Sequence, residues 1–143
     1  MERVNYKKIP SVLILLTVFS LRASAPFCNS LTITASLPVN PYLPLIKAIG
    51  MVETKNDTLA YNPEEEATGY FQIRPVRLKE YKRLTGSSYT IKDMFNYKKS
   101  EEVFLYFADR IGPYNFEQIA RSWNGSGSMT TSYWHRIRAL LPH

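Results

Sequence analysis

The stretch Tyr42-Leu-Pro-Leu-Ile-Lys-Ala-Ile-Gly-Met-Val-Glu53 contains the hydrophobic pattern that decides the fold. Its apolar residues recur at steps of three and four, the spacing that places side chains on one face of a helix. We therefore predict a helix over about residues 41–55. Glu53 follows Ile49 by four positions and Ile46 by seven, so its carboxylate falls on the apolar face of this helix.

A carboxylate on an apolar face is costly, because desolvation disfavours its charged form and raises its pKa. An acid that stays protonated near neutral pH can donate a proton to a leaving group. On position alone, Glu53 could instead turn into water at the helix end or pair with Lys55. The run Glu64-Glu65-Glu66 is most simply interpreted as a solvated patch in a loop.

The residues that follow this helix lose its period. Residues 56–73 contain the turn-forming pair Asn62-Pro63 and Gly69, a composition that predicts a loop and an irregular β hairpin. A second helix is predicted from Pro75 to Leu84, and Gly86 should end it.

Three further helices are predicted toward the C-terminus. The most clearly marked has Ser100 as its N-cap and ends at Gly112-Pro113. A short helix is predicted over residues 116–123, and a last one begins at Thr131, with apolar side chains up to Leu141 available for burial. The sequence thus predicts a mostly α fold with a small β element after the first helix.

Composition narrows the possible functions. The 143 residues suit one globular domain, with 45% hydrophobic and 21% charged residues. The net charge is +6. Five cations lie within residues 74–83, and we interpret them as a solvated helix face in preference to a nucleic-acid-binding site. One cysteine, Cys28, excludes an intrachain disulfide framework, and His135 and His143 suggest no metal site. No cofactor is implied, and the sequence indicates no oligomeric state.

The N-terminus has the pattern of a secretory signal peptide. Residues 1–25 combine basic residues, an apolar stretch over residues 12–21 and the small-residue cleavage pattern Ala23-Ser24-Ala25. We therefore expect residues 26–40 to be a linker and residues 41–143 to be the folded domain. The expected location is the periplasm or the cell envelope, with no transmembrane segment in the mature chain.

Three short motifs resemble those of a known family. Glu53-Thr54, the segment Gly69-Tyr-Phe-Gln-Ile73 and the segment Ala120-Arg-Ser-Trp-Asn-Gly-Ser-Gly127 are similar to the Glu-Ser, Gly-Leu-Met-Gln and Ala-Tyr-Asn-Ala-Gly motifs of the lysozyme-like lytic transglycosylases. The motifs occur in the family's order, and the resemblance extends from about residue 45 to residue 137. Asn96 also stands where a family Asn opens the long helix.

The resemblance implies a lysozyme-like α+β fold with a groove for the glycan strand of peptidoglycan. It makes Glu53 the catalytic acid, and it implies that six other residues bind substrate: Thr54, Tyr70, Gln72, Trp123, Asn124 and Tyr133. Structural roles are the alternatives for several of them. Trp123 could be a core residue, Gln72 could satisfy a turn, Asn124 could occupy a positive-φ turn, and both tyrosines could simply pack.

In this family a single glutamate can act first as acid and then as base, so that the sugar's own 6-hydroxyl closes an anhydro ring. A hydrolytic muramidase would need a second carboxylate. Asp57 is the nearest candidate, although Asn56-Asp57-Thr58 has the composition of a loop. A protein that binds peptidoglycan without cleaving it remains the other alternative.

Overall fold

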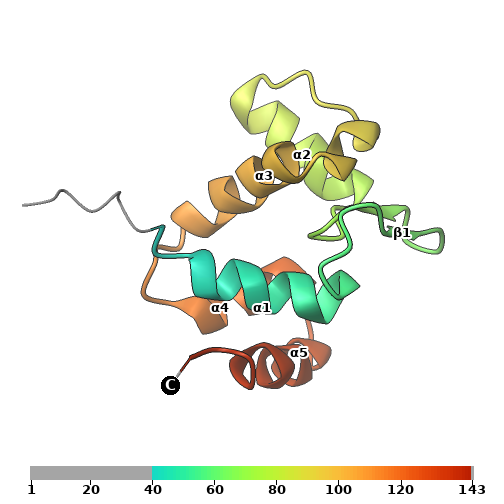
Figure 1. The fold of residues 1–143 in the computed structure, drawn as a ribbon. Coiled ribbons are helices and arrows are strands. Elements are labelled where there is room, and N and C mark those ends of the chain that lie inside the picture. The colour runs from blue at the N-terminus through green and yellow to red at the C-terminus, as the bar shows by residue number, and fades with distance from the viewer. Residues whose placement is uncertain (1–39, 143) are drawn as a thin grey trace, which may run out of the picture. The chain divides into compact units, whose positions relative to one another are not determined.

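The computed structural model describes residues 40–142 (Figure 1). The predicted signal peptide and all of the predicted linker except residue 40 lie outside this range. The elements in chain order are α1 (Leu43–Thr54), β1 (Tyr61–Asn62), β2 (Ala67–Thr68), α2 (Pro75–Thr85), the 3₁₀ helix η1 (Ile91–Phe95), α3 (Tyr97–Asp109), α4 (Phe116–Asn124) and α5 (Met129–Arg138).

The described residues confirm the predicted fold class. Helices dominate, and a two-stranded antiparallel sheet follows α1, with Tyr61 opposite Thr68 and Asn62 opposite Ala67. An isolated bridge from Thr68 to Ile73 extends the hairpin into the turn before α2. This turn therefore has a fixed position relative to the sheet, and it contains the second sequence motif.

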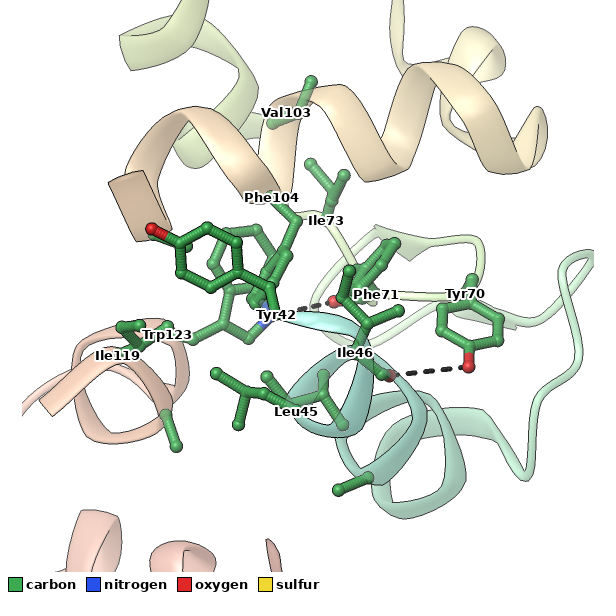
Figure 2. Packing of buried hydrophobic residues seen from close by; sticks show 14 of the residues in the cluster. Tyr42, Leu45, Ile46, Tyr70, Phe71, Ile73, Val103, Phe104, Ile119 and Trp123 are labelled. Atoms are coloured by element: carbon green, nitrogen blue, oxygen red, sulfur yellow. Dashed lines mark hydrogen bonds between the residues drawn. The ribbon is translucent and has the colours of Figure 1, made fainter. Parts of the chain in front are cut away.

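The core lies where α1, α3, α4 and this turn meet (Figure 2). Phe71 stacks on Phe104 with ring centroids 4.8 Å apart, and the Trp123 ring meets Phe104 edge-on at 5.0 Å. The indole nitrogen of Trp123 also donates to the Phe71 carbonyl oxygen at 3.1 Å. Leu45 and Ile46 of α1 complete this cluster and are fully buried. The packing holds three segments together that are far apart in sequence.

Two glycines allow the turn to approach its neighbours closely. Tyr70 lies against Gly50 of α1, where an added Cβ would stand 1.9 Å from the Tyr70 ring carbon Cζ. Gly69 has φ 74°, and a Cβ there would stand 2.0 Å from the backbone oxygen of Met94 in η1. Side chains at either position would push the turn away from α1 or from η1.

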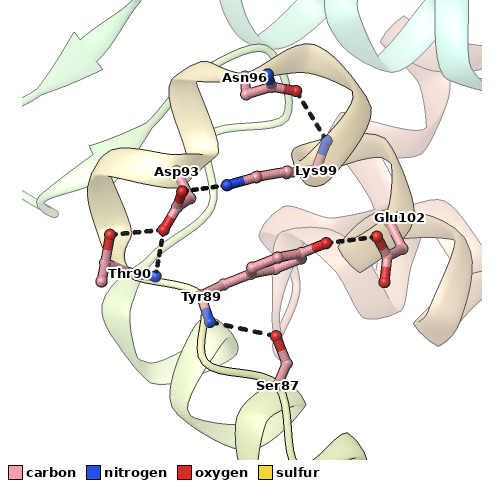
Figure 3. Close-up of polar contacts among 7 residues, drawn as sticks. All are labelled: Ser87, Tyr89, Thr90, Asp93, Asn96, Lys99 and Glu102. Carbon is pink, nitrogen blue, oxygen red and sulfur yellow. Dashed lines mark hydrogen bonds and ion pairs between the residues drawn. The ribbon is translucent and has the colours of Figure 1, made fainter.

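The predicted start of α3 is wrong. Ser100 does not cap the helix: it is buried within α3, and its hydroxyl donates to the Tyr97 carbonyl oxygen at 2.9 Å. Asn96 is the N-cap, because its side-chain oxygen accepts from the Lys99 backbone N–H at 3.2 Å (Figure 3). Both residue types suit an N-cap, and the sequence alone does not rank them. The family resemblance had placed Asn96 correctly.

The last helix also differs from its predicted bounds. It begins at Met129, two residues before Thr131, and ends at Arg138. Tyr133 and Ile137 are buried as expected, but Leu140 is 48% exposed. The helix ends before Leu140, so that residue no longer follows the helical spacing that would place it on the buried face.

Side-chain hydrogen bonds fix the segment between α2 and α3 (Figure 3). Thr90 and Asp93 form a capping box at the start of η1. The hydroxyls of Tyr81 and Tyr89 each donate to the Glu102 carboxylate at 2.7 Å. We call Tyr81, Tyr89 and Glu102 the α2–α3 edge.

None of the helices in residues 40–142 is both long and apolar enough to span a bilayer.

Candidate functional site

Glu53 lies in the last turn of α1 and is held by α5. The Tyr133 hydroxyl donates to Oε1 of Glu53 at 2.7 Å, a contact between residues eighty positions apart. Tyr133 itself is buried. Lys55 is exposed, and no ion pair joins it to Glu53 in the described part of the chain. Glu53 is therefore part of the packed structure and does not swing into water at the helix end.

Burial raises the pKa of the Glu53 carboxyl above its ordinary value. The Tyr133 hydroxyl and the charges of Arg136 and Arg74 act in the opposite direction, and Glu65 adds to the increase. Loss of hydration outweighs the hydrogen bond and both arginines, because a carboxylate in an apolar setting loses its water shell. The direction agrees with the expectation from the apolar face of α1.

The Glu53 carboxyl opens onto a small pocket with a volume of about 60 Å³. Its lining comes from the end of α1, the hairpin, the start of α2 and the end of α4. The lining residues are Glu53, Glu65, Gln72, Ile73, Arg74, Arg77, Trp123 and Asn124. All three sequence motifs therefore reach the same pocket, although they lie in separate parts of the chain.

Gln72 has the structural role that the sequence offered as one alternative, and it also lies at the pocket. It lines the pocket, and its amide nitrogen donates to the carbonyl oxygens of Gly69 at 3.0 Å and Ala60 at 3.4 Å. Its φ of 49° is unusual for a residue with a side chain. The two amide contacts stabilise this backbone conformation and so fix the pocket wall.

Trp123 and Asn124 line the pocket from the end of α4. Trp123 is at once a core residue, with 7% exposure, and a wall of the pocket. Asn124 is the last residue of α4, and its backbone oxygen accepts from Nη2 of Arg74 at 3.1 Å. The alternative that Asn124 occupies a positive-φ turn is wrong, because the positive φ falls on Gly125.

Thr54 and Tyr70 do not line this pocket. The Thr54 hydroxyl is within hydrogen-bond distance of the Gly50 and Tyr70 carbonyl oxygens, at 3.2 and 3.3 Å. The buried Tyr70 donates to Asn56 Oδ1 at 2.9 Å. Both side chains join the turn to α1, which is a structural role and not a contact with a ligand in the pocket.

Asp57 lies outside the pocket as well. It is exposed, and its Oδ1 accepts from the Leu59 backbone N–H at 2.8 Å. A side chain that binds the backbone two residues further on is an Asx turn, a common loop element. The interpretation of Asp57 as a loop residue is confirmed by this contact.

Sequence reasoning missed three charged residues of the pocket: Glu65, Arg74 and Arg77. Glu64, Glu65 and Glu66 are exposed, as the sequence predicts for a solvated run, but Glu65 also lines the pocket and lies 3.6 Å from Arg74. Of the five cations predicted to form a solvated face, Lys79, Lys82 and Arg83 are exposed, whereas the side chains of Arg74 and Arg77 are only 35% and 22% exposed. The available signal was the position of Arg74 directly after the second motif, with Arg77 three residues further on.

No protein-family model matches the chain, and neither a curated protein nor a solved structure does. The chemistry of the site must therefore be judged from its geometry and its motifs. A carboxyl with a raised pKa that faces a polar pocket can donate a proton to a group bound there. The cations around it can hold an anion or stabilise negative charge.

Proposed function

We propose that this protein cleaves the glycan strands of peptidoglycan as a lytic transglycosylase. The bond would be the β-1,4 link between N-acetylmuramic acid and N-acetylglucosamine. The observation that carries the proposal is the buried Glu53 carboxyl, whose pKa is raised and which opens onto a polar pocket. Cleavage of a glycosidic bond requires a proton donor to the leaving oxygen. The three motifs that meet at this pocket support a glycan as the substrate.

In the proposed reaction the Glu53 carboxyl gives its proton to the glycosidic oxygen as the bond from that oxygen to C1 breaks. The acetamido group of the muramic sugar stabilises the cationic centre. The Glu53 carboxylate then takes the proton of the 6-hydroxyl, and this oxygen bonds to C1. The product ends in a 1,6-anhydro ring, the carboxyl is protonated again, and no water is consumed.

The hydrogen bond from Tyr133 distinguishes the two carboxyl oxygens of Glu53. Oε1 accepts from Tyr133 at 2.7 Å, whereas Oε2 has no hydrogen-bond partner within residues 40–142. Every fully buried side-chain oxygen in that range has a partner, so Oε2 is not fully buried. We assign the transferred proton to Oε2, because Tyr133 keeps Oε1 occupied as an acceptor.

The proposed location follows from the substrate. Peptidoglycan lies outside the cytoplasmic membrane, so the enzyme would act in the periplasm or the cell envelope. The predicted signal peptide over residues 1–25 supports this location. An intact mass of exported protein that includes Met1 would contradict it, since the signal should be removed after Ala25 or a few residues later.

A hydrolytic muramidase is the second candidate, and Glu65 is the observation that favours it. Inverting and retaining glycosidases use two carboxylates on opposite sides of the bond. Glu65 lines the same pocket as Glu53, whereas Asp57 does not. In this mechanism the Glu65 carboxylate would take a proton from a water molecule that attacks C1, and the product would have a free reducing end.

Digestion of purified peptidoglycan in ¹⁸O-labelled water tests both mechanisms. We expect mass spectrometry to find anhydro muropeptides, each lighter by one water than the hydrolytic product and free of ¹⁸O. Glu53→Gln should reduce turnover by about 10² to 10⁴ and retain glycan binding, because it keeps the shape and loses the proton. Asp57→Asn is the matched control and should have little effect.

Two other results would replace the proposal. Products that contain ¹⁸O and are lost in Glu65→Gln would establish the muramidase mechanism. Binding of peptidoglycan without any cleavage, unchanged in Glu53→Gln, would establish the third alternative, a binding protein with a glycan groove.

A further inference from the structure

Two arginines line the same pocket as the proposed acid. Arg74 is the N-cap residue of α2, and Arg77 lies in the first turn of that helix. Both line the pocket together with Glu53 and Glu65. When Glu53 is protonated, the ionisable side chains of the pocket have a net charge of +1. Such a pocket favours an anion over a neutral group.

Each guanidinium has donors to spare. Arg74 Nη2 donates to the Asn124 carbonyl oxygen at 3.1 Å, and Arg77 Nη2 donates to the Ser122 carbonyl oxygen at 2.9 Å. A guanidinium carries five N–H donors in a planar fork that matches a carboxylate. For each arginine, the contact with the end of α4 is the single hydrogen bond found in the part of the chain that the structure describes.

The nearest carboxylates do not saturate these donors. Glu65 is 3.6 Å from Arg74 and 55% exposed, and Glu80 is 3.7 Å from Arg77 and 46% exposed. Both distances exceed those of charge-assisted hydrogen bonds, which lie near 2.7 to 2.9 Å. The two carboxylates are therefore loosely paired neighbours that a ligand can replace or join.

Arg77 is also held in an apolar setting. Its guanidinium carbon lies 4.8 Å from the ring centroid of Phe107 and 5.3 Å from that of Trp123. Burial lowers the pKa of Arg77, with Glu80 acting in the opposite direction. A cation with little hydration binds an anion more strongly than one in open water does, because less water must be displaced.

We propose that Arg74 and Arg77 bind a carboxylate of the glycan substrate beside the bond that is cleaved. This inference rests on the proposed function and adds the class of glycan: strands with a free carboxylate on the muramic sugar or on its stem peptide. The pocket, with a volume of about 60 Å³, has room for a group of the size of a carboxylate.

Two parts of peptidoglycan could supply the carboxylate. One is the lactyl group of a muramic sugar without a stem peptide, and the other is a carboxylate of the stem peptide itself. The test therefore compares soluble strands without peptides, the same strands with the lactyl group converted to a neutral amide, strands with their peptides, and neutral oligomers of N-acetylglucosamine.

Binding is measured by calorimetry with the Glu53→Gln protein, so that no strand is cleaved. We expect peptide-free strands to bind about tenfold more tightly than their amidated form. This factor corresponds to the free energy of one hydrogen bond to a charged group. Arg77→Gln and Arg74→Gln should each reduce this ratio toward one. Lys79→Gln is the matched control on the same helix, because Lys79 is exposed and lies outside the pocket, and it should leave the ratio unchanged.

The outcomes separate the two levels of the proposal. Equal binding of charged and amidated strands, with and without peptides, would overturn the arginine assignment and leave the proposed function intact. A preference seen only for peptide-bearing strands would assign the carboxylate to the stem peptide. No binding of any glycan would overturn the proposed function itself. The comparison of charged with amidated strands on the Glu53→Gln protein needs no arginine variant. It therefore tests the proposal even if Arg77→Gln fails to fold.

Discussion

Two glutamates of this protein accept hydrogen bonds of the same length from tyrosines, yet their pKa values move in opposite directions. Tyr133 donates to Glu53 at 2.7 Å, and Tyr81 and Tyr89 each donate to Glu102 at 2.7 Å. The hydroxyls lower the pKa of the exposed Glu102. Burial raises the pKa of Glu53 in spite of the hydrogen bond from the Tyr133 hydroxyl. The surroundings, and not the tyrosine, decide which form of the carboxyl is favoured.

The difference between Glu53 and Glu102 shows that burial, and not a hydrogen bond from tyrosine, favours the protonated carboxyl that a proton donor needs. A hydroxyl that donates to a carboxylate stabilises its charged form, which is the opposite of what an acid catalyst needs. The α2–α3 edge therefore holds an ionised glutamate in a structural role. At the pocket, burial overrides the same kind of bond, so the tyrosine can orient the Glu53 carboxyl without keeping it ionised.

The largest expected effect is a loss of stability at one of two glycines that share a φ of 74°. Gly69 lies in the turn that contributes to the pocket, and Gly86 ends α2 near the α2–α3 edge. Gly69→Ala at the pocket would place a Cβ 2.0 Å from the Met94 oxygen, whereas Gly86→Ala at the end of α2 meets nothing within 4 Å. We expect Gly69→Ala to lower the free energy of unfolding by about 3 kcal/mol, from strain and overpacking together. Gly86→Ala should cost about 1 kcal/mol, from strain alone.

Urea denaturation measures both values, with the slope of each transition checked for constancy. Equal losses in the two variants would mean that the turn before α2 can move away from η1. The tight fit of the pocket wall would then not be a feature of the protein.

The next effect concerns the two kinds of tyrosine. Tyr133→Phe should reduce kcat/KM about tenfold, since a hydrogen bond to a charged group is worth about that factor. It should also move the alkaline limit of activity to higher pH, because the hydroxyl normally lowers the pKa of Glu53. Tyr81→Phe is the matched control at the α2–α3 edge and should change neither quantity. A pH profile that does not move in Tyr133→Phe would mean that Tyr133 acts only by packing.

The smallest effect concerns stability. The raised pKa of Glu53 means that the free energy of unfolding falls as pH rises from the unfolded pKa, about 4.3, through the folded one. Glu53→Gln should therefore be more stable than the wild type at neutral pH, and the gain should disappear below the unfolded pKa.

Glu102→Gln should show the opposite sign. Its pKa is lowered, so the stabilisation by Glu102 is present above the unfolded pKa and is lost as pH falls through the folded one. The cost of the substitution at neutral pH should stay under about 1 kcal/mol, because Glu102 is exposed. Thermal melts at pH 7 and pH 3.5 check both variants, and changes of the same sign at pH 7 would contradict the comparison.

The sequence predicted elements whose signals are local. The spacing of Leu45, Ile46 and Ile49 predicts α1, and this spacing also places Glu53 on the buried face. Gly86 marks the end of α2 in the structure as in the sequence, with φ 74°. The start of α3 was predicted wrongly, because Asn96 and Ser100 are both suitable caps and only tertiary packing decides between them.

The pocket was predicted in part, for a physical reason. Gln72, Trp123 and Asn124 carry motif signals, whereas Glu65 and Arg77 belong to charged runs of a kind that is usually solvated. Whether a charged side chain lies on the surface depends on what packs beside it. For Arg77 this is Phe107 and Trp123, thirty and forty-six residues further on, and no local pattern reveals such contacts.

The hydrogen bond from Tyr133 to Glu53 also determines when the Glu53 site can form during protein synthesis. A ribosome makes α1 first and α5 last, so a growing chain contains Glu53 long before it contains the hydroxyl that orients it. A fragment that stops before residue 133 would keep the acid and lose its partner, together with the helix that shields it from water. The hydrogen-bonded pair therefore forms only after α5 has been made, and a fragment that lacks α5 cannot have it.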